Sequence, residues 1–219
     1  NNLIGLQYKI NTDENTCTVT NYYGTAKKHV VIPETYRGYT VVGIEDYAFD
    51  YQVIKSITIP HTVKMIGEGA FLSCGYLEAI YGFENCIELN KISDKTFYGC
   101  ESLEYIYLPS TITTIGNEAF LVCIKLKNIN FPQSLHTIGE SAFVACYSLS
   151  DIDFPNSLTS IGGAAFYKCY SLEEVFLPDK VSQKLVCAFV DCDSLANIYV
   201  SENSLNFSSI DGVLYNKDS

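Results

Sequence analysis

The nine cysteines are the residues best suited to chemistry, since thiols form disulfides, bind metals and act as nucleophiles. Six of them follow a phenylalanine by three residues: Cys74, Cys100, Cys123, Cys146, Cys169 and Cys192. Zinc sites need cysteine pairs about two to four residues apart, whereas the last five of these six are spaced by 23 residues. Equivalent positions of a repeat point the same way, so we predict reduced thiols in the core, packed as small apolar side chains.

A ladder of disulfides is the competing interpretation, because neighbouring strands lie about 4.8 Å apart and a disulfide tolerates that separation. The first coil weighs against it, because Gln52 occupies the equivalent position and no thiol is required there. Cys17, Cys86 and Cys187 lie outside the series, and their odd number leaves room for one exposed thiol. We assign no role to these three residues.

The three histidines, His29, His61 and His136, fall at different places in the repeat and lack a serine or cysteine partner in a recognisable motif. The chain carries no nucleophile elbow, no phosphate-binding loop and no zinc-binding His-Glu pattern. We therefore predict surface histidines, no catalytic residue, no metal site and no cofactor. An enzyme is not expected.

The regular cysteines belong to a repeat that runs through most of the chain. Alanine-phenylalanine pairs recur 23 residues apart at Ala119-Phe120, Ala142-Phe143, Ala165-Phe166 and Ala188-Phe189. A fixed period of this length indicates a solenoid, whose units bury their apolar faces only by stacking. We predict an α/β repeat solenoid, a right-handed superhelix of about seven 23-residue coils with short parallel strands, short helical or 3₁₀ turns and β-rich end caps.

One unit shows how a coil is built. Ile106 and Leu108 alternate with two tyrosines, which predicts a short strand with one buried face, ended by the proline that follows. A second extended segment is expected over 112–115, and Gly116 then turns the chain through a positive φ or a close backbone approach. Residues 117–120 are predicted to form one helical turn. The equivalent phenylalanines should form one continuous buried row: Phe49, Phe71, Phe97, Phe120, Phe143, Phe166 and Phe189.

The two ends depart from the repeat. We expect residues 1–40 to form an N-terminal β cap, residues 41–200 to form the repeats, and residues 201–219 to form a C-terminal hairpin cap. Asp211-Gly212 between apolar residues predicts that hairpin. Because it stops abruptly at Ser219, we expect more chain to follow in the natural protein.

The formal net charge of −11 argues against nucleic acid and anionic membranes as partners, because both bind clusters of lysine and arginine. No apolar run reaches about 18 residues, so membrane insertion by this segment is not expected.

The repeat resembles the BspA-like, or Treponema-type, leucine-rich repeat family. The string Leu-Pro-x-x-Ile-Thr-x-Ile-Gly-x-x-Ala-Phe-x-x-Cys at 108–123 is specific to that family, and Gly-Val-Leu-Tyr-Asn-Lys-Asp at 212–218 is similar to a segment that often follows such repeats. The resemblance implies a secreted or cell-surface protein of bacteria or mucosal protozoa that acts in adhesion, by binding host proteins or other cells. It supplies no catalytic residues.

Strand positions on either side of each buried isoleucine point outward together, because side chains alternate along a strand. Exposed aromatic residues on such a sheet are typical of protein-binding surfaces, although cross-strand stacking that only stabilises the sheet explains them equally well. The acidic members favour a basic partner, and we favour a solvated acidic patch over a calcium site. The candidate ligand-binding residues are Tyr81, Tyr105, Tyr107, Asn128, Asn130, Asp151, Asp153, Glu174, Phe176 and Tyr199.

These patterns lead to three functional hypotheses. The first is a non-enzymatic binding module, extracellular or on the cell surface, that adheres to host proteins or other cells. The second is a structural spacer that presents another domain. The third is a carbohydrate-binding module that uses exposed tyrosines as stacking platforms for sugar rings.

Overall fold

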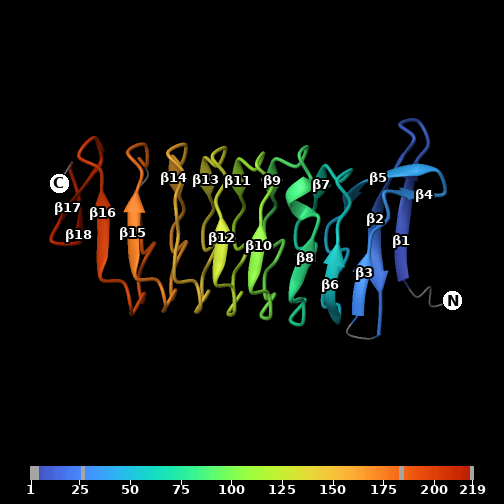
Figure 1. Ribbon diagram of the computed structural model, residues 1–219, viewed down its shortest axis with the longest axis horizontal. Coiled ribbons are helices and arrows are strands. Elements are labelled where there is room, and N and C mark those ends of the chain that lie inside the picture. The colour runs from blue at the N-terminus through green and yellow to red at the C-terminus, as the bar shows by residue number, and fades with distance from the viewer. Residues whose placement is uncertain (1–4, 26–27, 183–184, 218–219) are drawn as a thin grey trace.

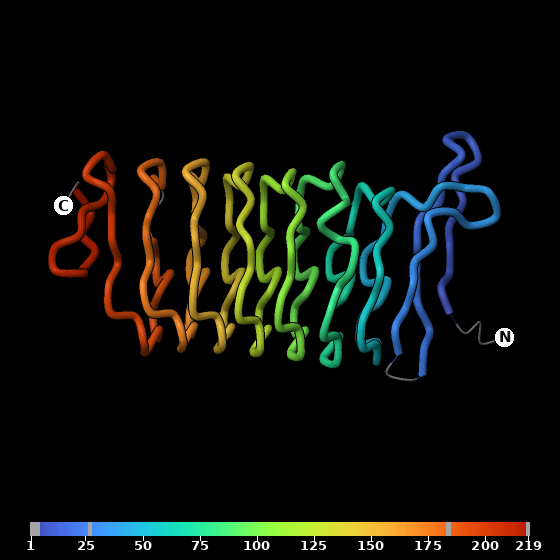
Figure 2. Tube along the Cα trace, in the orientation of Figure 1, coloured from blue at the N-terminus to red at the C-terminus, as the bar shows by residue number. Residues whose placement is uncertain are grey.

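The computed structural model describes residues 5–25, 28–182 and 185–217. The chain forms a β-solenoid of about eight turns, with the N-terminal turns on the right of Figure 1 and the C-terminal turns on the left. The tube in Figure 2 shows successive coils standing side by side, so the predicted stacking is confirmed, although the number of turns is about eight where about seven were predicted. Residues 1–4 of the expected N-terminal cap and residues 218–219 of the expected hairpin lie outside the described residues.

The N-terminal residues form an antiparallel hairpin that is hydrogen-bonded to the coils. β1 (Gly5–Asn11) pairs with β2 (Thr16–Tyr23), and β2 pairs in parallel with β5 (Tyr39–Ile44). β4 (Thr35–Tyr36) folds back onto β5. β5 links this hairpin to the repeats by pairing with a strand of the next coil.

A first strand column carries the candidate ligand-binding residues. Backbone pairing divides it into three parallel sheets, in the orders β3-β6-β8, β10-β12 and β15-β16. The register joins residues one coil apart, such as Ile106 with Ile129. Residues 151–153, which the repeat predicts as a strand, belong to none of these three sheets. The strands are β3 (Lys28–Val31), β6 (Ile54–Thr58), β8 (Ala79–Tyr81), β10 (Tyr105–Tyr107), β12 (Asn128–Asn130), β15 (Glu174–Leu177) and β16 (Asn197–Val200).

A second column of short strands confirms the second extended segment of each coil. Four of its members form one parallel sheet in the order β14-β13-β11-β9, in which Ile115 pairs with Ile92 on one side and Ile138 on the other. The strands are β7 (Met65–Ile66), β9 (Lys91–Ile92), β11 (Thr114–Ile115), β13 (Thr137–Ile138) and β14 (Ser160–Ile161).

The segment that carries each Ala-Phe pair is not helical, so the prediction of an α/β fold with helical turns is wrong. Helix in the described part of the chain is limited to one 3₁₀ turn, η1 (Phe83–Asn85). Glu118 and Val122, on either side of Phe120, have φ values of 54° and 60°, whereas a right-handed helix needs negative φ throughout. Positive φ recurs two residues before and two residues after every phenylalanine of the row.

We call these five-residue segments, centred on each phenylalanine, the turn row. The alternating φ values aim every second N–H at the following coil. In the coil of Phe120, three N–H groups donate to the next coil over 2.8–2.9 Å: Glu118 to Glu140, Phe120 to Ala142 and Val122 to Val144. These donors are satisfied only when another coil is stacked on the turn row.

The sequence left two reasons open for the glycine that follows the second strand of a coil: a positive φ or a close backbone approach. The structure shows a close approach of the neighbouring coil's backbone. A Cβ on Gly139 would lie 2.6 Å from the carbonyl carbon of Gly116, and a Cβ on Gly116 would lie 2.7 Å from the backbone nitrogen of Asp94. Neither glycine has a positive φ. The absent side chain therefore lets successive coils approach each other.

The core contains one continuous row of stacked rings, as predicted. Neighbouring phenylalanine rings of the row lie 5.1–5.5 Å apart, with 3–22° between their planes. The rings from Phe49 to Phe166 are fully buried, whereas Phe189 at the C-terminal end is half-buried. Tyr22 lengthens the row by one ring that the repeat did not predict, 5.4 Å from Phe49.

The C-terminal residues form the hairpin that Asp211-Gly212 predicts. β17 (Phe207–Ile210) pairs with β18 (Val213–Asn216), and both turn residues have positive φ, at 52° and 80°. Asn197 is close to this turn, so the hairpin packs beside β16.

The ring row predicts a graded loss of stability along the solenoid. Phe143→Ala removes a fully buried ring stacked on both sides, so the free energy of unfolding should fall by about 3–5 kcal/mol. Phe189→Ala removes a half-buried ring that stacks on Phe166 alone within the row, and should cost clearly less. Urea denaturation followed by circular dichroism measures both. Equal losses at the two positions would contradict a row that is buried in the middle and open at its C-terminal end.

Candidate functional site

The regular cysteines are buried and reduced, as predicted. Their thiols nevertheless do more than fill space, because each donates to the carbonyl oxygen of the phenylalanine one coil earlier, over 2.9–3.3 Å. The carbonyl of Phe97, for example, accepts both the N–H of Cys100 and the thiol of Cys123. The series thus adds hydrogen bonds between coils, a contribution that the interpretation of cysteine as a small apolar residue left out.

Burial raises the pKa of Cys74, Cys100, Cys123 and Cys146, because the thiolate would lose its hydration in the core. A hydrogen bond between Cys169 and Cys192 raises the pKa of Cys169 and lowers the pKa of Cys192. The pKa of Cys74 is raised to about 12 by burial, and burial raises the pKa of Cys86 to about 12 as well. A thiol that stays protonated is a poor nucleophile and a poor metal ligand. Cys187 is the exposed thiol that the odd count suggested.

The histidines lie on the surface, as predicted. The ring of His29 contacts the hydroxyls of Ser56 and Thr58 at 2.8 and 3.1 Å, and His61 lies 3.4 Å from Glu34. Across residues 5–25, 28–182 and 185–217, no group of three or more histidine, cysteine or acidic side chains is arranged to hold a metal ion.

The candidate ligand-binding residues lie on the outward side of the first strand column, which we call the strand face. Inward and outward positions alternate there as expected, since Ile106 and Val175 are buried between exposed neighbours. The large aromatic residues of this face are exposed to 54% at Tyr81, 46% at Tyr105, 65% at Tyr107, 60% at Phe176 and 38% at Tyr199.

Parallel pairing gathers these residues into two groups. Tyr105 and Tyr107 on β10 lie beside Asn128 and Asn130 on β12. Farther along, Glu174 and Phe176 on β15 lie beside Asn197 and Tyr199 on β16. Asp151 and Asp153 are exposed between the two groups, and Tyr81 lies at the end of β8. The strand face is therefore an extended surface with two aromatic centres.

In the first group, Tyr107 is more accessible than Tyr105. The ammonium of Lys127 lies 5.6 Å from the centre of the Tyr105 ring and 2.7 Å from a carboxylate oxygen of Glu104. The hydrogen bond from Lys127 lowers the pKa of Glu104, and the same bond raises the pKa of Lys127. Tyr105 thus has a local packing role beside its candidate binding role.

Asn130 is engaged in stacking the coils. Its carboxamide oxygen accepts the N–H of Leu108 at 2.7 Å, and its carboxamide nitrogen donates to the carbonyl of Leu108 at 3.2 Å. Asn130 therefore helps to hold two neighbouring coils together.

The second group borders a groove of about 500 Å³, which we call the C-terminal groove. Its walls include Asp153, Phe176, Asp179 and Tyr199. The rings of Phe176 and Tyr199 stack 4.7 Å apart, with 20° between their planes. The hydroxyl of Tyr199 donates to Glu174 at 3.4 Å, and the pKa of Tyr199 is raised, first by desolvation and then by the charge of Glu174.

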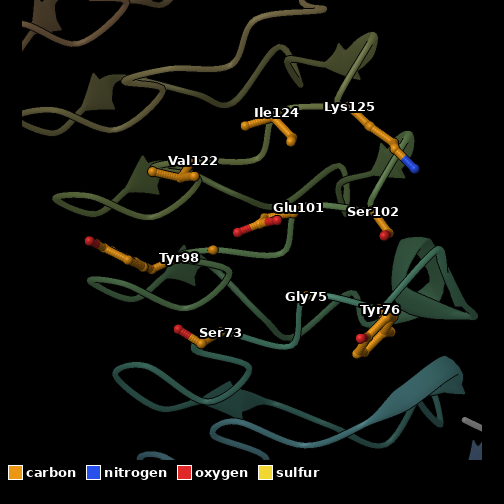
Figure 3. Close-up of a pocket in the computed structure, with 10 residues that line it drawn as sticks. Ser73, Gly75, Tyr76, Tyr98, Glu101, Ser102, Val122, Ile124 and Lys125 are labelled. Atoms are coloured by element: carbon orange, nitrogen blue, oxygen red, sulfur yellow. The ribbon is translucent and has the colours of Figure 1, made fainter.

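Another groove, of about 530 Å³, lies beside the turn row of three successive coils (Figure 3). We call it the turn-side groove. Glycines open it, since a Cβ on Gly99 would lie 3.3 Å from the hydroxyl of Ser73. Tyr76, Glu101 and Lys125 contribute an aromatic ring and opposite charges to its lining. Sequence reasoning missed both grooves, although Gly75 and Gly99 break the pattern of larger residues near this part of the repeat.

Acidic charge is concentrated in the C-terminal half of the chain. Residues 128–219 contain 11 acidic residues and 4 lysines, and so contribute −7 of the net charge of −11. All ion pairs formed within the described ranges involve residues up to Lys127. The carboxylates around the C-terminal groove are therefore not neutralised by a described salt bridge.

The chain belongs to the BspA-type leucine-rich repeat family. The model of the BspA type leucine-rich repeat region matches residues 42–91 and 90–211, in six copies. A search of curated proteins found no match. The helices of the described residues include none with the length and apolar character needed to cross a membrane.

Solved structures of bacterial leucine-rich repeat proteins share the fold. A leucine-rich cell surface protein from Faecalibacterium prausnitzii A2-165 is 32% identical, with a TM-score of 0.85 over 97% of this chain and 57% of that protein. The T. pallidum leucine-rich repeat protein is 30% identical, with a TM-score of 0.60 over 88% of this chain and 78% of that one. The pneumococcal vaccine antigen PcpA is 27% identical, with a TM-score of 0.64 over 98% and 53%. This chain spans little more than half of the first and third.

Thiol chemistry should separate Cys187 from the buried cysteines. A thiol reagent should modify one of the nine cysteines in the native protein and all nine after denaturation, because only Cys187 is exposed. Cys187→Ser should abolish the native reaction. Rapid modification of several native thiols, or disulfides between successive coils, would overturn the buried series.

The raised pKa values predict that stability falls at alkaline pH. Thiols of the unfolded chain titrate at about pH 8.5. Below that pH the buried thiols are protonated in both the folded and the unfolded state, so their full contribution to the free energy of unfolding is present. Above it the unfolded state loses protons first, and unfolding free energy should fall until the pH passes the native pKa, about 12 for Cys74. Denaturation across this range should show a shallower fall in Cys123→Ala than in the wild-type protein. A flat wild-type profile would contradict the assignment.

Proposed function

We propose that the strand face is a docking surface for a partner protein, and that the protein is a non-enzymatic adhesion module at a cell surface. One observation carries the proposal: five large aromatic side chains are exposed in one column, while the strand residues beside them are buried, as Ile106 and Val175 are, or half-buried, as Ile80 and Ile198 are. Sheet stabilisation explains the stacked pair of Phe176 and Tyr199. It does not explain Tyr107, which is 65% exposed and whose register partner is Asn130.

The scaffold beneath this face supports docking. The stacked rings of the core and the paired strands hold the backbone beneath the outward side chains in place before a partner arrives, so little backbone entropy remains to be lost on binding. Tyrosine adds to this advantage, because it offers a large contact area with few rotatable bonds.

The surface location is supported by the relatives. The Faecalibacterium prausnitzii protein is described as a cell surface protein, and the pneumococcal relative as a vaccine antigen. By analogy we place this chain outside the cell, where its exposed aromatic face meets host proteins or other cells.

A carbohydrate is the second candidate ligand, and the turn-side groove favours it. Tyr76 supplies a ring beside that groove, while Ser73, Ser102 and Glu101 supply polar atoms suited to hydroxyl groups. Binding there would leave the strand face free, so the two candidates are separable by mutation.

Arrays of extracellular matrix and plasma proteins, with a glycan array in parallel, test the proposal. Tyr105→Ser with Tyr107→Ser should weaken binding to a captured protein by more than about 1 kcal/mol, because aromatic side chains dominate interface energetics. Both positions are exposed, so the melting temperature should change little.

The matched control is Tyr147→Ser with Tyr170→Ser, a stacked tyrosine pair 4.8 Å apart that lies outside the strand face. It should leave binding unchanged. Equal affinity in the Tyr105 and Tyr107 double variant would sink the docking proposal. A large drop in its melting temperature would favour the sheet-stabilising role, and a wild-type protein that binds neither array would favour a spacer.

A further inference from the structure

We infer that the C-terminal groove receives an arginine side chain from a basic segment of the partner. The inference rests on the proposed function, because it names the chemistry that one end of the strand face recognises. Four side chains of the groove carry the argument: Asp153, Phe176, Asp179 and Tyr199.

The first step is the aromatic platform. Phe176 and Tyr199 stack on each other, yet Phe176 remains 60% exposed, so one ring face is open to a ligand beside the groove. A planar guanidinium stacks on such a ring by combining dispersion with attraction to the negative ring face. The β15-β16 register fixes both rings, which prepares the platform before binding.

The second step is the charge around the platform. Asp153 is exposed and Asp179 is half-buried in the groove wall, and neither forms an ion pair with any described residue. Glu174 adds a third negative charge beside Tyr199. Among the described residues, no lysine or arginine lines the groove, although the exposed Lys180 follows Asp179 in the chain. A guest that neutralises these charges must be a cation.

The third step selects arginine among cations. Arginine can stack its flat face on Phe176 while its N–H groups point sideways to carboxylates, an arrangement that a spherical ammonium group cannot match. A compact metal ion would gain nothing from the rings, and no metal-binding cluster is present among the described residues. The surplus of acidic residues in 128–219 would also draw a basic segment toward this end of the molecule.

A direct titration tests the inference. The probe is acetyl-Gly-Arg-Gly-Arg-Gly-amide, and its twin carries citrulline, a neutral isostere, in place of both arginines. Binding is followed by NMR shifts of the Phe176 and Tyr199 rings. We expect ring shifts with the arginine peptide, at least about fivefold weaker binding of the citrulline twin, and weaker binding at higher ionic strength.

Two variants locate the binding. Asp153→Asn with Asp179→Asn should weaken the arginine peptide about fivefold or more, and Phe176→Leu should weaken it by a similar factor. The control Asp191→Asn with Asp193→Asn removes the same charge from the turn side, at positions outside the groove, and should change affinity less than about twofold.

The inference is overturned if both peptides bind equally, or if the two double variants weaken the arginine peptide by the same factor. The second result would show general attraction to an acidic surface. Either failure leaves the docking proposal intact, provided that the Tyr105 and Tyr107 double variant still loses its captured partner. If the Tyr105 and Tyr107 double variant keeps its partner and the arginine peptide also binds, the proposal that the partner docks through Tyr105 and Tyr107 is wrong. The C-terminal groove then remains as a separate binding site.

Discussion

The structure depends on one constraint: every coil must satisfy its backbone through the coil beside it. In the turn row, left-handed residues flank each phenylalanine, and from Phe49 to Phe166 alternate N–H groups donate to carbonyls of the next coil. The ring stack and the thiol hydrogen bonds also join neighbouring coils, since Phe120 stacks on Phe143 and the thiol of Cys146 donates to the carbonyl of Phe120 one coil earlier. An isolated coil would leave these groups unpaired, so stability arises from stacking.

This constraint separates what the fold requires from what a ligand can use. Inward positions are occupied mainly by phenylalanine, isoleucine, leucine, valine, alanine and cysteine in a closely packed core. Outward strand positions vary widely at equivalent places, as in Tyr107, Asn130, Asp153 and Phe176. Asn130 is a partial exception, because its carboxamide bonds the neighbouring backbone. Eight of the nine thiols are buried, and burial protects them from oxidants that reach the surface.

Much of this architecture could be predicted from the sequence, because apolar periodicity reports directly on which residues face the core. The ring row, both strand segments of a coil and the Asp211-Gly212 hairpin were predicted correctly. The helical turn at 117–120 was not, because Glu118 and Val122 adopt a left-handed φ that stacking imposes against their own preference. The thiol acceptors and both grooves also escaped prediction, since each depends on atoms brought together from different coils. Tyr107 and Phe176 were placed on the outward face, but their local roles depend on neighbours such as Asn130 and Tyr199.

The central claim is that the solenoid holds an aromatic strand face outward for a partner. Hydroxyl-radical footprinting of the protein with and without its captured partner tests this claim most directly, because it reads the accessibility of individual rings. The account predicts that Tyr107 and Phe176 lose reactivity on binding, while Tyr51 and Tyr147, exposed elsewhere on the coils, keep theirs. Unchanged reactivity at Tyr107 and Phe176, with protection confined to Tyr51 or Tyr147, would contradict the account.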